Sequence, residues 1–290
     1  MGAVGPQALA YGIQNQHGID LAVAEVNRAG GINGVPLRVV TRDDRADGSE
    51  AARIAGQFVA NTNLIAVIGH AGSSAEVSAA HVYDMGHLPA VATSPSSPDI
   101  TGMSRWVFRM ASSDSVNGAK LARFATALSD SLHRPTRVAV LYQNDAYGRG
   151  LADAFLHNFT GQILARDPFG SDTNLEPYIS YLKTQSPDIV FVASDEAVGM
   201  KLLREARQLN FHTTFLAGDG WQGVVAEPAS EGAFIGTPFT AQSSAPAVRK
   251  FAAAFRAKYG MIPDAHAALA YDATHLVATA LRSGATTREA

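Results

Sequence analysis

The chain has 290 residues, of which 47% are hydrophobic and 17% charged, and its formal net charge is −3. This balance is typical of folded globular proteins and excludes a largely disordered chain. No basic run could lie along phosphates, so we expect no nucleic-acid partner. No apolar stretch approaches the roughly 20 residues that a membrane-spanning helix needs, so we expect no insertion into a bilayer. The absence of cysteine excludes disulfides, thiolate metal sites and cysteine nucleophiles.

Helical and strand patterns alternate over the first 112 residues. Apolar residues at three- and four-residue spacing predict helices over residues 19–29, 52–59 and 74–85. Apolar and β-branched runs predict strands over residues 37–40, 64–68, 88–92 and 106–109. Residues 64–68 are apolar at every position, as a central parallel strand must be when helices cover both faces of its sheet.

The same alternation continues beyond residue 112. It predicts helices near residues 116–128, 148–159 and 198–209, and strands near residues 138–142, 163–166, 189–193 and 215–217. Near residue 236 the alternation breaks, and two helical patterns follow at residues 247–259 and 265–283. Strands that alternate with helices indicate βαβ units and parallel sheets.

These elements predict an α/β protein with two Rossmann-like, three-layer lobes joined by a hinge. A chain of this length exceeds the size at which a single core usually stops growing. We expect residues 1–112 and 241–290 to form one lobe and residues 113–240 to form the other. The chain then crosses between the lobes at about 111–115 and 237–241, and such paired crossings make a natural hinge.

Loops that follow parallel strands carry the ligand-binding groups in open α/β sheets. In the first lobe, a glycine-rich turn brings Ser73 and Ser74 to the start of a helix, where free N–H groups and the helix dipole favour an anion. The alternative is that one of these serines is only an N-cap. The next loop, residues 93–99, is rich in hydroxyls and holds two prolines, although taken alone it is equally an ordinary turn.

In the second lobe, Asp219 lies between two glycines just after a predicted strand. A carboxylate in this position can accept hydrogen bonds from an ammonium group. An Asx turn is the alternative interpretation, and the loop alone favours it slightly.

Catalytic patterns are absent from the sequence. It has no P-loop, no G-x-S-x-G elbow, no H-E-x-x-H pair and no dinucleotide fingerprint. The nine histidines are dispersed, and no pair has the helical spacing of metal ligands with an acid nearby. We therefore expect no metal, no cofactor and no enzymatic activity.

Several motifs in order along the chain point to one family. They are the Gly-Gly-Ile-Asn-Gly-Val-Pro-Leu run at 30–37, Asp43-Asp44, Val67-Ile68-Gly69-His70 with Ser73-Ser74, and Arg137-Val138-Ala139-Val140 leading to Asp145-Ala146-Tyr147-Gly148. With them the chain resembles, from about residue 5 to about residue 284, the periplasmic leucine/isoleucine/valine-binding proteins. These are the type I solute receptors of branched-chain amino-acid ABC importers.

The resemblance implies a set of ligand-binding residues. It implies that the carboxylate of an amino acid meets Ser73 and the hydroxyls of residues 94–97, and that its ammonium group meets Asp219. Tyr147 then closes over the ligand from the second lobe, Tyr11 packs over its side chain from the first, and His266 forms part of the wall. Asp195 or a neighbour stands where the family has a tyrosine, which implies a further acid near the pocket. The full set is Tyr11, Ser73, Ser94, Ser96, Ser97, Tyr147, Asp195, Asp219 and His266.

The resemblance also implies a role. We expect an extracytoplasmic protein, periplasmic or extracellular, soluble or lipid-anchored, that captures an amino acid or a similar small carboxylate in the cleft between its lobes. Its partner is then a membrane ABC permease. Two alternatives stay open: a ligand-sensing domain of a receptor or regulator, and an α/β enzyme that uses His70 or His266 as its acid or base.

Both ends of the sequence differ from the family pattern. Residues 1–4 have neither the charged nor the apolar region of an export signal, so we expect any such signal to have been removed or never present. We also expect the family's first strand to be missing or truncated before Gly5. After Ala290 we expect a further segment, with a third crossing between the lobes, to be missing.

Overall fold

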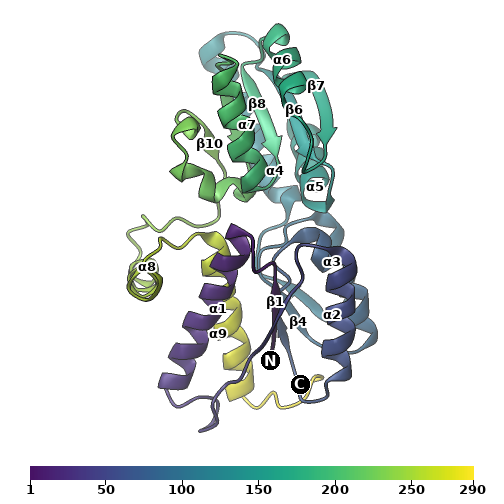
Figure 1. The fold of residues 1–290 in the computed structure, drawn as a ribbon, viewed down its shortest axis with the longest axis vertical. Coiled ribbons are helices and arrows are strands. Elements are labelled where there is room, and N and C mark those ends of the chain that lie inside the picture. Colours follow the sequence, from purple (N-terminus) through teal and green to yellow (C-terminus); the bar gives the residue numbers. More distant parts are fainter. The chain divides into compact units, whose positions relative to one another are not determined.

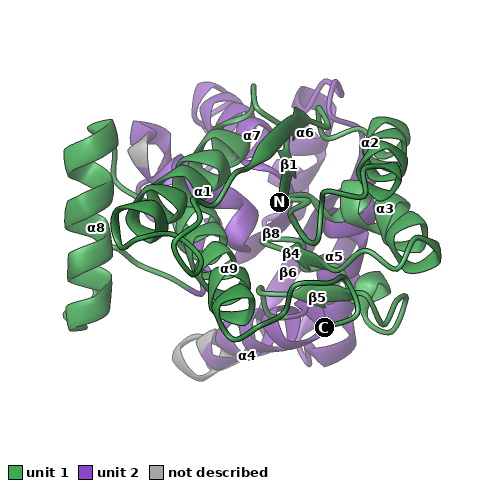
Figure 2. Cartoon of the chain, turned by 90° about the horizontal axis from the view of Figure 1, so that it is seen from below, with its two compact units in different colours: residues 1–112, 239–290 green, residues 113–238 purple. Residues whose placement is uncertain are grey.

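The computed structural model describes residues 1–290, apart from the side chains of residues 128–132 and 226. The chain divides into two compact units, which Figure 2 colours separately. Unit 1 consists of Met1–Ser112 and Phe239–Ala290, and unit 2 of Ser113–Pro238. The chain therefore leaves unit 1 after Ser112 and returns to it at Phe239.

Unit 1 is built on a five-stranded sheet with the order β2-β1-β3-β4-β5, in which all neighbouring strands are parallel. Its strands are β1 (Gly2–Gly5), β2 (Val40–Asp43), β3 (Val67–Ile68), β4 (Ala90–Ala92) and β5 (Val107–Arg109). Its helices are α1 (Ala10–Arg28), α2 (Gly48–Ala60), α3 (Ser73–Met85), the 3-10 helix η1 (Pro98–Ile100), α8 (Pro246–Tyr259) and α9 (Ala265–Arg282).

Two helical layers cover the two faces of this sheet. Successive residues of a strand point to opposite faces, so Ala3 and Ile68 join the buried cluster of α1 and α9, whereas Val4 and Val67 join that of α2 and α3. Figure 1 shows the same arrangement, with α1 and α9 on one side of β1 and α2 and α3 on the other. The helix that follows β1 and the helix that follows β3 therefore lie on opposite faces.

Unit 2 repeats the architecture with the strand order β10-β9-β8-β6-β7, again with parallel neighbours. Its strands are β6 (Arg137–Gln143), β7 (Gln162–Phe169), β8 (Ile189–Ala193), β9 (Thr214–Ala217) and β10 (Phe234–Ile235). Its helices are α4 (Asp114–Leu132), α5 (Ala146–Asn158), α6 (Glu176–Gln185), α7 (Glu196–Gln208) and the 3-10 helices η2 (Asp219–Ala226) and η3 (Pro228–Ser230).

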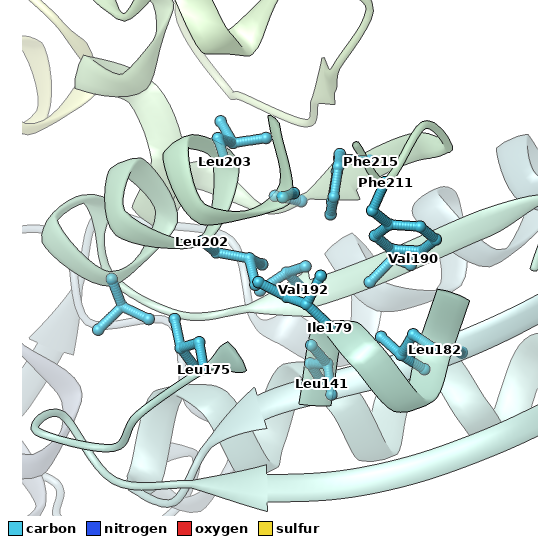
Figure 3. Packing of buried hydrophobic residues seen from close by; sticks show 14 of the residues in the cluster. Leu141, Leu175, Ile179, Leu182, Val190, Val192, Leu202, Leu203, Phe211 and Phe215 are labelled. Atoms are coloured by element: carbon cyan, nitrogen blue, oxygen red, sulfur yellow. The ribbon is translucent and has the colours of Figure 1, made fainter. Parts of the chain in front are cut away.

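The core of unit 2 has the same two-sided construction. Val190 and Val192 of β8 belong to the cluster that Figure 3 shows, which is built mainly with α6 and α7. Phe191, between them, faces α4 and α5, where its ring stacks on Phe155 with the ring centroids 4.0 Å apart. Both rings are fully buried, and burial of one such side chain stabilises the fold by about 1.5–3 kcal/mol. The prediction of an α/β protein with helices on both faces of parallel sheets is confirmed.

One expectation about the N-terminus is wrong. The first strand is present as β1, and it lies inside the sheet, paired with β2 on one side and β3 on the other. Its residues, Gly-Ala-Val-Gly, are small, and a Cβ added to Gly2 would meet the ring of Phe58 at 2.8 Å. Small residues let α2 pack closely on this strand, but they also give it a weak strand signal in the sequence.

The edge strands also differ from the predictions. The strand expected at 37–40 begins only at Val40 and runs through three polar residues to Asp43, and β10 was not predicted. Both are edge strands, with a neighbour on one side only. Polar residues are tolerated at an edge, so hydrophobic runs locate these strands poorly.

Arg288 provides a test of how the end of the chain is attached to unit 1. Its Nε donates to the carbonyl oxygen of Leu64 at 2.9 Å, and its Nη2 donates to those of Asn61 at 2.9 Å and Val59 at 3.1 Å. The last carbonyls of a helix such as α2 lack partners within the helix, and a cation there is favoured by the helix dipole.

We expect Arg288→Ala to lower the free energy of unfolding by about 2 kcal/mol, since hydrogen bonds from a charged donor contribute about 1.5–3 kcal/mol. Urea unfolding followed by circular dichroism measures this change. Arg249→Ala, at an exposed position on α8, is the control and should change stability by less than about 0.5 kcal/mol. Equal stability of the two variants would show that the Arg288 contacts contribute nothing.

Candidate functional site

The strand order of unit 1 marks the edge of the sheet at which a ligand can bind. β1 and β3 are neighbours, and the helices that follow them cover opposite faces. Ligands of open α/β sheets bind at such a point, beyond the carboxyl ends of the strands. Tyr11, in the first turn of α1, and Ser73, the first residue of α3, both lie here. The Tyr11 hydroxyl oxygen is 3.2 Å from where a Cβ of Gly72 would be, so the two loops meet.

Ser73 does not cap its helix, and the N-cap interpretation was wrong. The N-cap of α3 is Gly72, which makes no side-chain cap. The Ser73 Oγ instead accepts hydrogen bonds from the backbone N–H groups of Ser96 and Ser97, both at 3.2 Å. An oxygen that accepts twice still has its own proton to donate, and no acceptor for it occurs among the described side chains. Ser73 therefore joins two loops and keeps a donor for a ligand.

Ser94 places a buried hydroxyl without a hydrogen-bond partner next to this turn. The residue is 7% exposed, and its Oγ has no hydrogen-bond partner among the side chains that the structure describes. A buried hydroxyl without a partner costs about 1–3 kcal/mol, and such atoms commonly mark a missing ligand or water.

The rest of the hydroxyl-rich loop is held in place by its neighbours. Ser96 and Ser97 are buried, and the Ser97 Oγ accepts from the N–H of Asp99 at the start of η1. Arg109 of β5 donates to the carbonyl oxygen of Ser97 at 2.9 Å and to the Thr101 hydroxyl at 3.1 Å. The loop is thus a braced part of unit 1.

Tyr11 and His266 lie together, although 255 positions separate them in the chain. Their ring centroids are 5.4 Å apart with a tilt of 44°. The two helices that carry them, α1 and α9, approach closely at Gly18, which has no side chain. A Cβ at this position would lie only 2.2 Å from the carbonyl oxygen of Ala267. Unit 1 therefore brings the serines, Tyr11 and His266 together at one end of its sheet.

Unit 2 has an equivalent point between β6 and β8. The helices that follow these neighbouring strands, α5 and α7, also cover opposite faces. Asp145 caps α5 by accepting from Gly148 N–H, and Asp195 caps α7 by accepting from Val198 N–H. The backbone N–H of Asp195 donates to the Gln143 Oε1 at 3.2 Å, which ties the ends of the two strands together.

Tyr147 and Asp219 form the polar pair of unit 2. The Tyr147 hydroxyl donates to the Asp219 Oδ1 at 3.1 Å and accepts from the Gly220 N–H at 3.0 Å. Burial, and then the charges of Asp219 and Asp114, raise the pKa of Tyr147, so it stays protonated and can donate. Asp219 is 9% exposed and starts η2, and its carboxylate bonds Tyr147 rather than forming only a local turn.

Three carboxylates lie at this end of unit 2, those of Asp145, Asp195 and Asp219. Burial raises the pKa of Asp145, and the charge of Asp195 raises it further. Mutual repulsion of this kind shows that the loops gather negative charge. An ammonium group would relieve the repulsion, whereas a second carboxylate would increase it.

The structure excludes His70 as the acid or base of the enzyme alternative. His70 is fully buried, with its Nδ1 2.7 Å from the Asp44 Oδ2 and its Nε2 3.2 Å from the Tyr83 hydroxyl. A side chain enclosed in this way cannot reach a substrate. In the part of the chain whose side chains are described, no group of three or more acidic or histidine side chains could hold a metal ion.

Two buried polar residues of unit 1 were missed from the sequence. Asn15 accepts from the Thr93 hydroxyl at 2.6 Å, and Glu76 accepts from the His70 backbone N–H at 2.8 Å. The sequence contained a sign that Glu76 is buried. Glu76 lies three, four and seven positions before buried residues of its helix, which is the spacing of one helical face. A charged residue in such a row is itself a sign of a buried polar site.

Within the described residues, no helix has the length and apolar character needed to cross a membrane. With the fold and both polar clusters in view, the chain can be compared with known proteins. The family model described as "Periplasmic binding protein" matches residues 3–290, and the chain belongs to this family.

Comparison with individual relatives and solved structures shows which kinds of binding protein this chain is similar to. The chain is 27% identical, over 76% of its length, to an amino acid binding protein of Pseudomonas aeruginosa, and 26% identical, over 82%, to the Leu/Ile/Val-binding protein of Escherichia coli. It spans only 60% and 66% of the lengths of these two relatives.

Among structures, the branched-chain amino acid transporter substrate binding protein LivJ of Streptococcus pneumoniae, in complex with isoleucine, superimposes with a TM-score of 0.89 at 28% identity. The match covers 99% of this chain and 84% of that one. The predicted family and its two-lobe type I fold are confirmed. These relatives are named as binding proteins, and none of them is named as an enzyme.

Glu76 yields a prediction for stability against pH. Burial raises the pKa of Glu76 from 4.5 to about 7. The fold thus favours the protonated acid, so the stabilisation is complete below pH 4.5 and is lost as pH rises through about 7. Between pH 5 and pH 8 the wild-type protein should lose about 2.5 kcal/mol of stability through this group, at 1.36 kcal/mol per pKa unit.

Glu76→Gln removes the ionisation, so its stability relative to wild type should rise by about that amount over the same pH range. Urea unfolding at pH 5 and pH 8 measures the difference. Glu231→Gln, at an exposed position, is the control and should show no such trend. Parallel stability curves for Glu76→Gln and wild type would contradict the prediction.

Proposed function

We propose that this chain is a solute-binding protein that captures an amino acid, with the carboxylate held by unit 1 and the ammonium group by unit 2. The observation that carries this proposal is the opposite chemistry of the two clusters. Unit 1 offers hydroxyl donors at a helix start, and unit 2 offers carboxylates. A zwitterion is the small ligand that needs both.

The unit 1 cluster suits a carboxylate for three reasons. Ser73 begins α3, where the helix dipole favours negative charge, and it has a proton to donate. Ser94 has a buried hydroxyl without a partner. Ser73 and Ser94 can then donate to the same group, while the Tyr11 and His266 rings supply an apolar wall beside it.

The unit 2 cluster suits an ammonium group. Asp219 is nearly buried and accepts one hydrogen bond from Tyr147, so one of its oxygens is already oriented. Gly218 and Gly220 make room for the Tyr147 side chain, since a Cβ on Gly218 would lie 2.8 Å from its hydroxyl oxygen and a Cβ on Gly220 would lie 2.9 Å from its ring. We propose that Asp219 accepts from the ligand's ammonium group, with Asp195 contributing further negative charge.

The relatives are named as an amino acid binding protein, a Leu/Ile/Val-binding protein and a branched-chain amino acid transporter substrate binding protein, and these names support the proposal. We propose that the same holds here, in an extracytoplasmic location and with an ABC permease as partner. We further propose that the crossings near residues 112 and 238 act as a hinge. A ligand shifts such a hinge only if it binds the closed state better than the open one, which requires contacts with both units.

Calorimetry with a panel of L-leucine, L-isoleucine, L-valine, L-phenylalanine, L-glutamate and benzoate tests the ligand class. We expect at least one amino acid to bind with micromolar affinity or tighter, about −8 kcal/mol or better. Its decarboxylated amine and its deaminated acid should both bind more weakly. If benzoate binds and no amino acid does, the ligand is a carboxylate and the ammonium assignment is wrong.

Asp219→Asn tests the ammonium contact while keeping the shape of the side chain. Loss of a buried charged partner should weaken L-leucine binding about 30-fold or more, or about 2–5 kcal/mol. Binding of 4-methylpentanoate, which is leucine without its amino group, should hardly change, since the group that Asp219 recognises is already missing. An equal loss for both ligands would mean that Asp219 supports the fold and not the ammonium group.

A further inference from the structure

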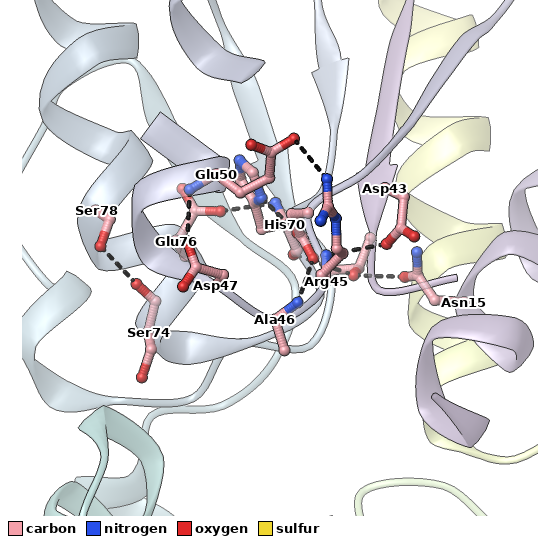
Figure 4. A network of polar contacts seen from close by, with 12 residues as sticks. Asn15, Asp43, Arg45, Ala46, Asp47, Glu50, His70, Ser74, Glu76 and Ser78 are labelled. Atoms are coloured by element: carbon pink, nitrogen blue, oxygen red, sulfur yellow. Dashed lines mark hydrogen bonds and ion pairs between the residues drawn. The ribbon is translucent and has the colours of Figure 1, made fainter. Parts of the chain in front are cut away.

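The turn that carries Ser73 is supported from behind by buried, ionisable side chains that the proposed ligand contacts do not use. They are Asp44 from the loop after β2, His70 from the loop after β3, and Glu76 from the first turns of α3. All three are completely buried. Figure 4 shows Glu76 next to His70, whose backbone N–H donates to the Glu76 carboxylate.

Asp44 and His70 have complete sets of partners. The Asp44 Oδ1 accepts from the N–H of Ala46 at 3.0 Å, and its Oδ2 lies 2.7 Å from the His70 Nδ1. The His70 Nε2 lies 3.2 Å from the Tyr83 hydroxyl. Asp44, His70 and Tyr83 thus form a satisfied chain of hydrogen bonds.

Among these three residues, Glu76 is the one whose side chain lacks a complete set of hydrogen-bond partners. Its Oε2 accepts from the backbone N–H of His70 at 2.8 Å, but its Oε1 is buried with no partner among the described side chains. An ionised carboxylate in this state is costly, and burial raises the pKa of Glu76 to about 7. Glu76 therefore changes its charge near neutral pH.

The charged and titratable groups around Glu76 come from four segments, the loops after β2 and β3 and the helices α3 and α2. His70 lowers its pKa, Asp44 raises it, and Tyr83 faces it from the same helix. The neighbouring helix α2 contributes Asp47, which caps its own N-terminus, and an exposed ion pair between Glu50 and Arg53. No cation in this set bonds the free oxygen of Glu76.

Glu76 is joined to the Ser73 turn at both ends of that turn. Its side chain holds the N–H of His70, and its own backbone N–H donates to the carbonyl oxygen of Gly72 at 3.0 Å. The carbonyl oxygen of His70 in turn accepts from Thr93 N–H at 3.2 Å, next to the buried Ser94. The Glu76 side chain thus fixes His70, whose backbone also holds the adjacent loop at Thr93, and the Glu76 backbone fixes the other end of the turn at Gly72.

We propose that Glu76 is a positioning residue for the carboxylate-binding turn and that its proton is coupled to the ligand's carboxylate. The proposal rests on the proposed function, since it concerns the site assigned there to unit 1. When Glu76 is protonated, the helix start presents its dipole and the Ser73 hydroxyl to the ligand without a competing charge. When Glu76 is ionised, a second negative charge lies in the first turns of the same helix and opposes the carboxylate.

The sign of the effect follows from linkage. Two nearby negative charges disfavour each other, so bound carboxylate raises the pKa of Glu76, and binding near pH 7 takes up a proton. The affinity then falls as pH rises from 6 to 8. A rise of one unit in the pKa of Glu76 on binding, from about 7, lowers the affinity about fivefold between pH 6 and pH 8, and a larger rise lowers it up to about tenfold.

The test is calorimetry with L-leucine at pH 6, 7 and 8, each in two buffers with different ionisation enthalpies. For the wild-type protein we expect roughly a five- to tenfold weaker affinity at pH 8 than at pH 6 and net proton uptake at pH 7. Glu76→Gln, which mimics the protonated acid, should bind at pH 8 about as tightly as wild type does at pH 6, with the proton uptake reduced.

Two further variants separate coupling from support of the fold. Glu76→Ala should bind more weakly than Glu76→Gln at every pH, because it cannot hold the His70 N–H. Glu205→Gln is the matched control, since Glu205 is a glutamate on α7 of unit 2 that also has a buried carboxylate oxygen without a partner. It should keep the wild-type pH dependence.

The possible results are distinct. If L-leucine binds, but wild type and Glu76→Gln show the same pH dependence and the same proton uptake, the coupling is refuted while the proposed function stands. If the wild-type protein binds neither L-leucine nor any other amino acid of the panel, the proposed function fails and this proposal fails with it.

Discussion

Both units depend on one constraint, which is that a parallel sheet must be covered by helices on both faces. In each unit two neighbouring strands therefore send their following helices to opposite sides, β1 and β3 in unit 1 and β6 and β8 in unit 2. The chain diverges at these points, and the backbone groups beyond the strand ends lack ladder partners. Serines fill this position in unit 1, and acids fill it in unit 2. The hydrophobic core thus decides where polar chemistry can lie.

Most polar groups at these points are satisfied within the protein, which makes the unsatisfied ones informative. Ser73, Ser97 and Asp195 have partners that brace the loops. The Ser94 hydroxyl and one oxygen of Glu76 are buried without partners in the described part of the chain. Each such group costs free energy. In the proposed function, a ligand carboxylate accepts a hydrogen bond from Ser94 and so removes this cost, whereas protonation lowers the cost at Glu76. The same desolvation penalty therefore explains both residues.

The sequence predicted the central elements better than the edges and the ends. Strand β8 was located residue for residue at 189–193, because its five residues are all apolar and buried. Strands β2 and β10 were misplaced or missed, because edge positions accept polar residues and short runs. Ser73 was singled out correctly as a polar residue at a helix start, but its partners are backbone groups more than 20 residues away, which no local pattern specifies. Tyr11 and His266 were predicted as site residues only through the family resemblance, because they come from opposite ends of the chain and no local pattern links them; the structure places their rings 5.4 Å apart.

The amino-acid sequence by itself determined the α/β class, the two-sided burial of the sheets and the polar character of the loops after the strands. It could do so because hydrophobic period and turn residues act over a few positions along the chain. Only the tertiary structure decided that Gly72, and not a serine, is the N-cap of α3, that His70 is buried between Asp44 and Tyr83, and that Glu76 lies buried with one oxygen unpaired. Those outcomes depend on which distant groups the packed helices bring together and on how much water they exclude. No local stretch of sequence specifies either of these.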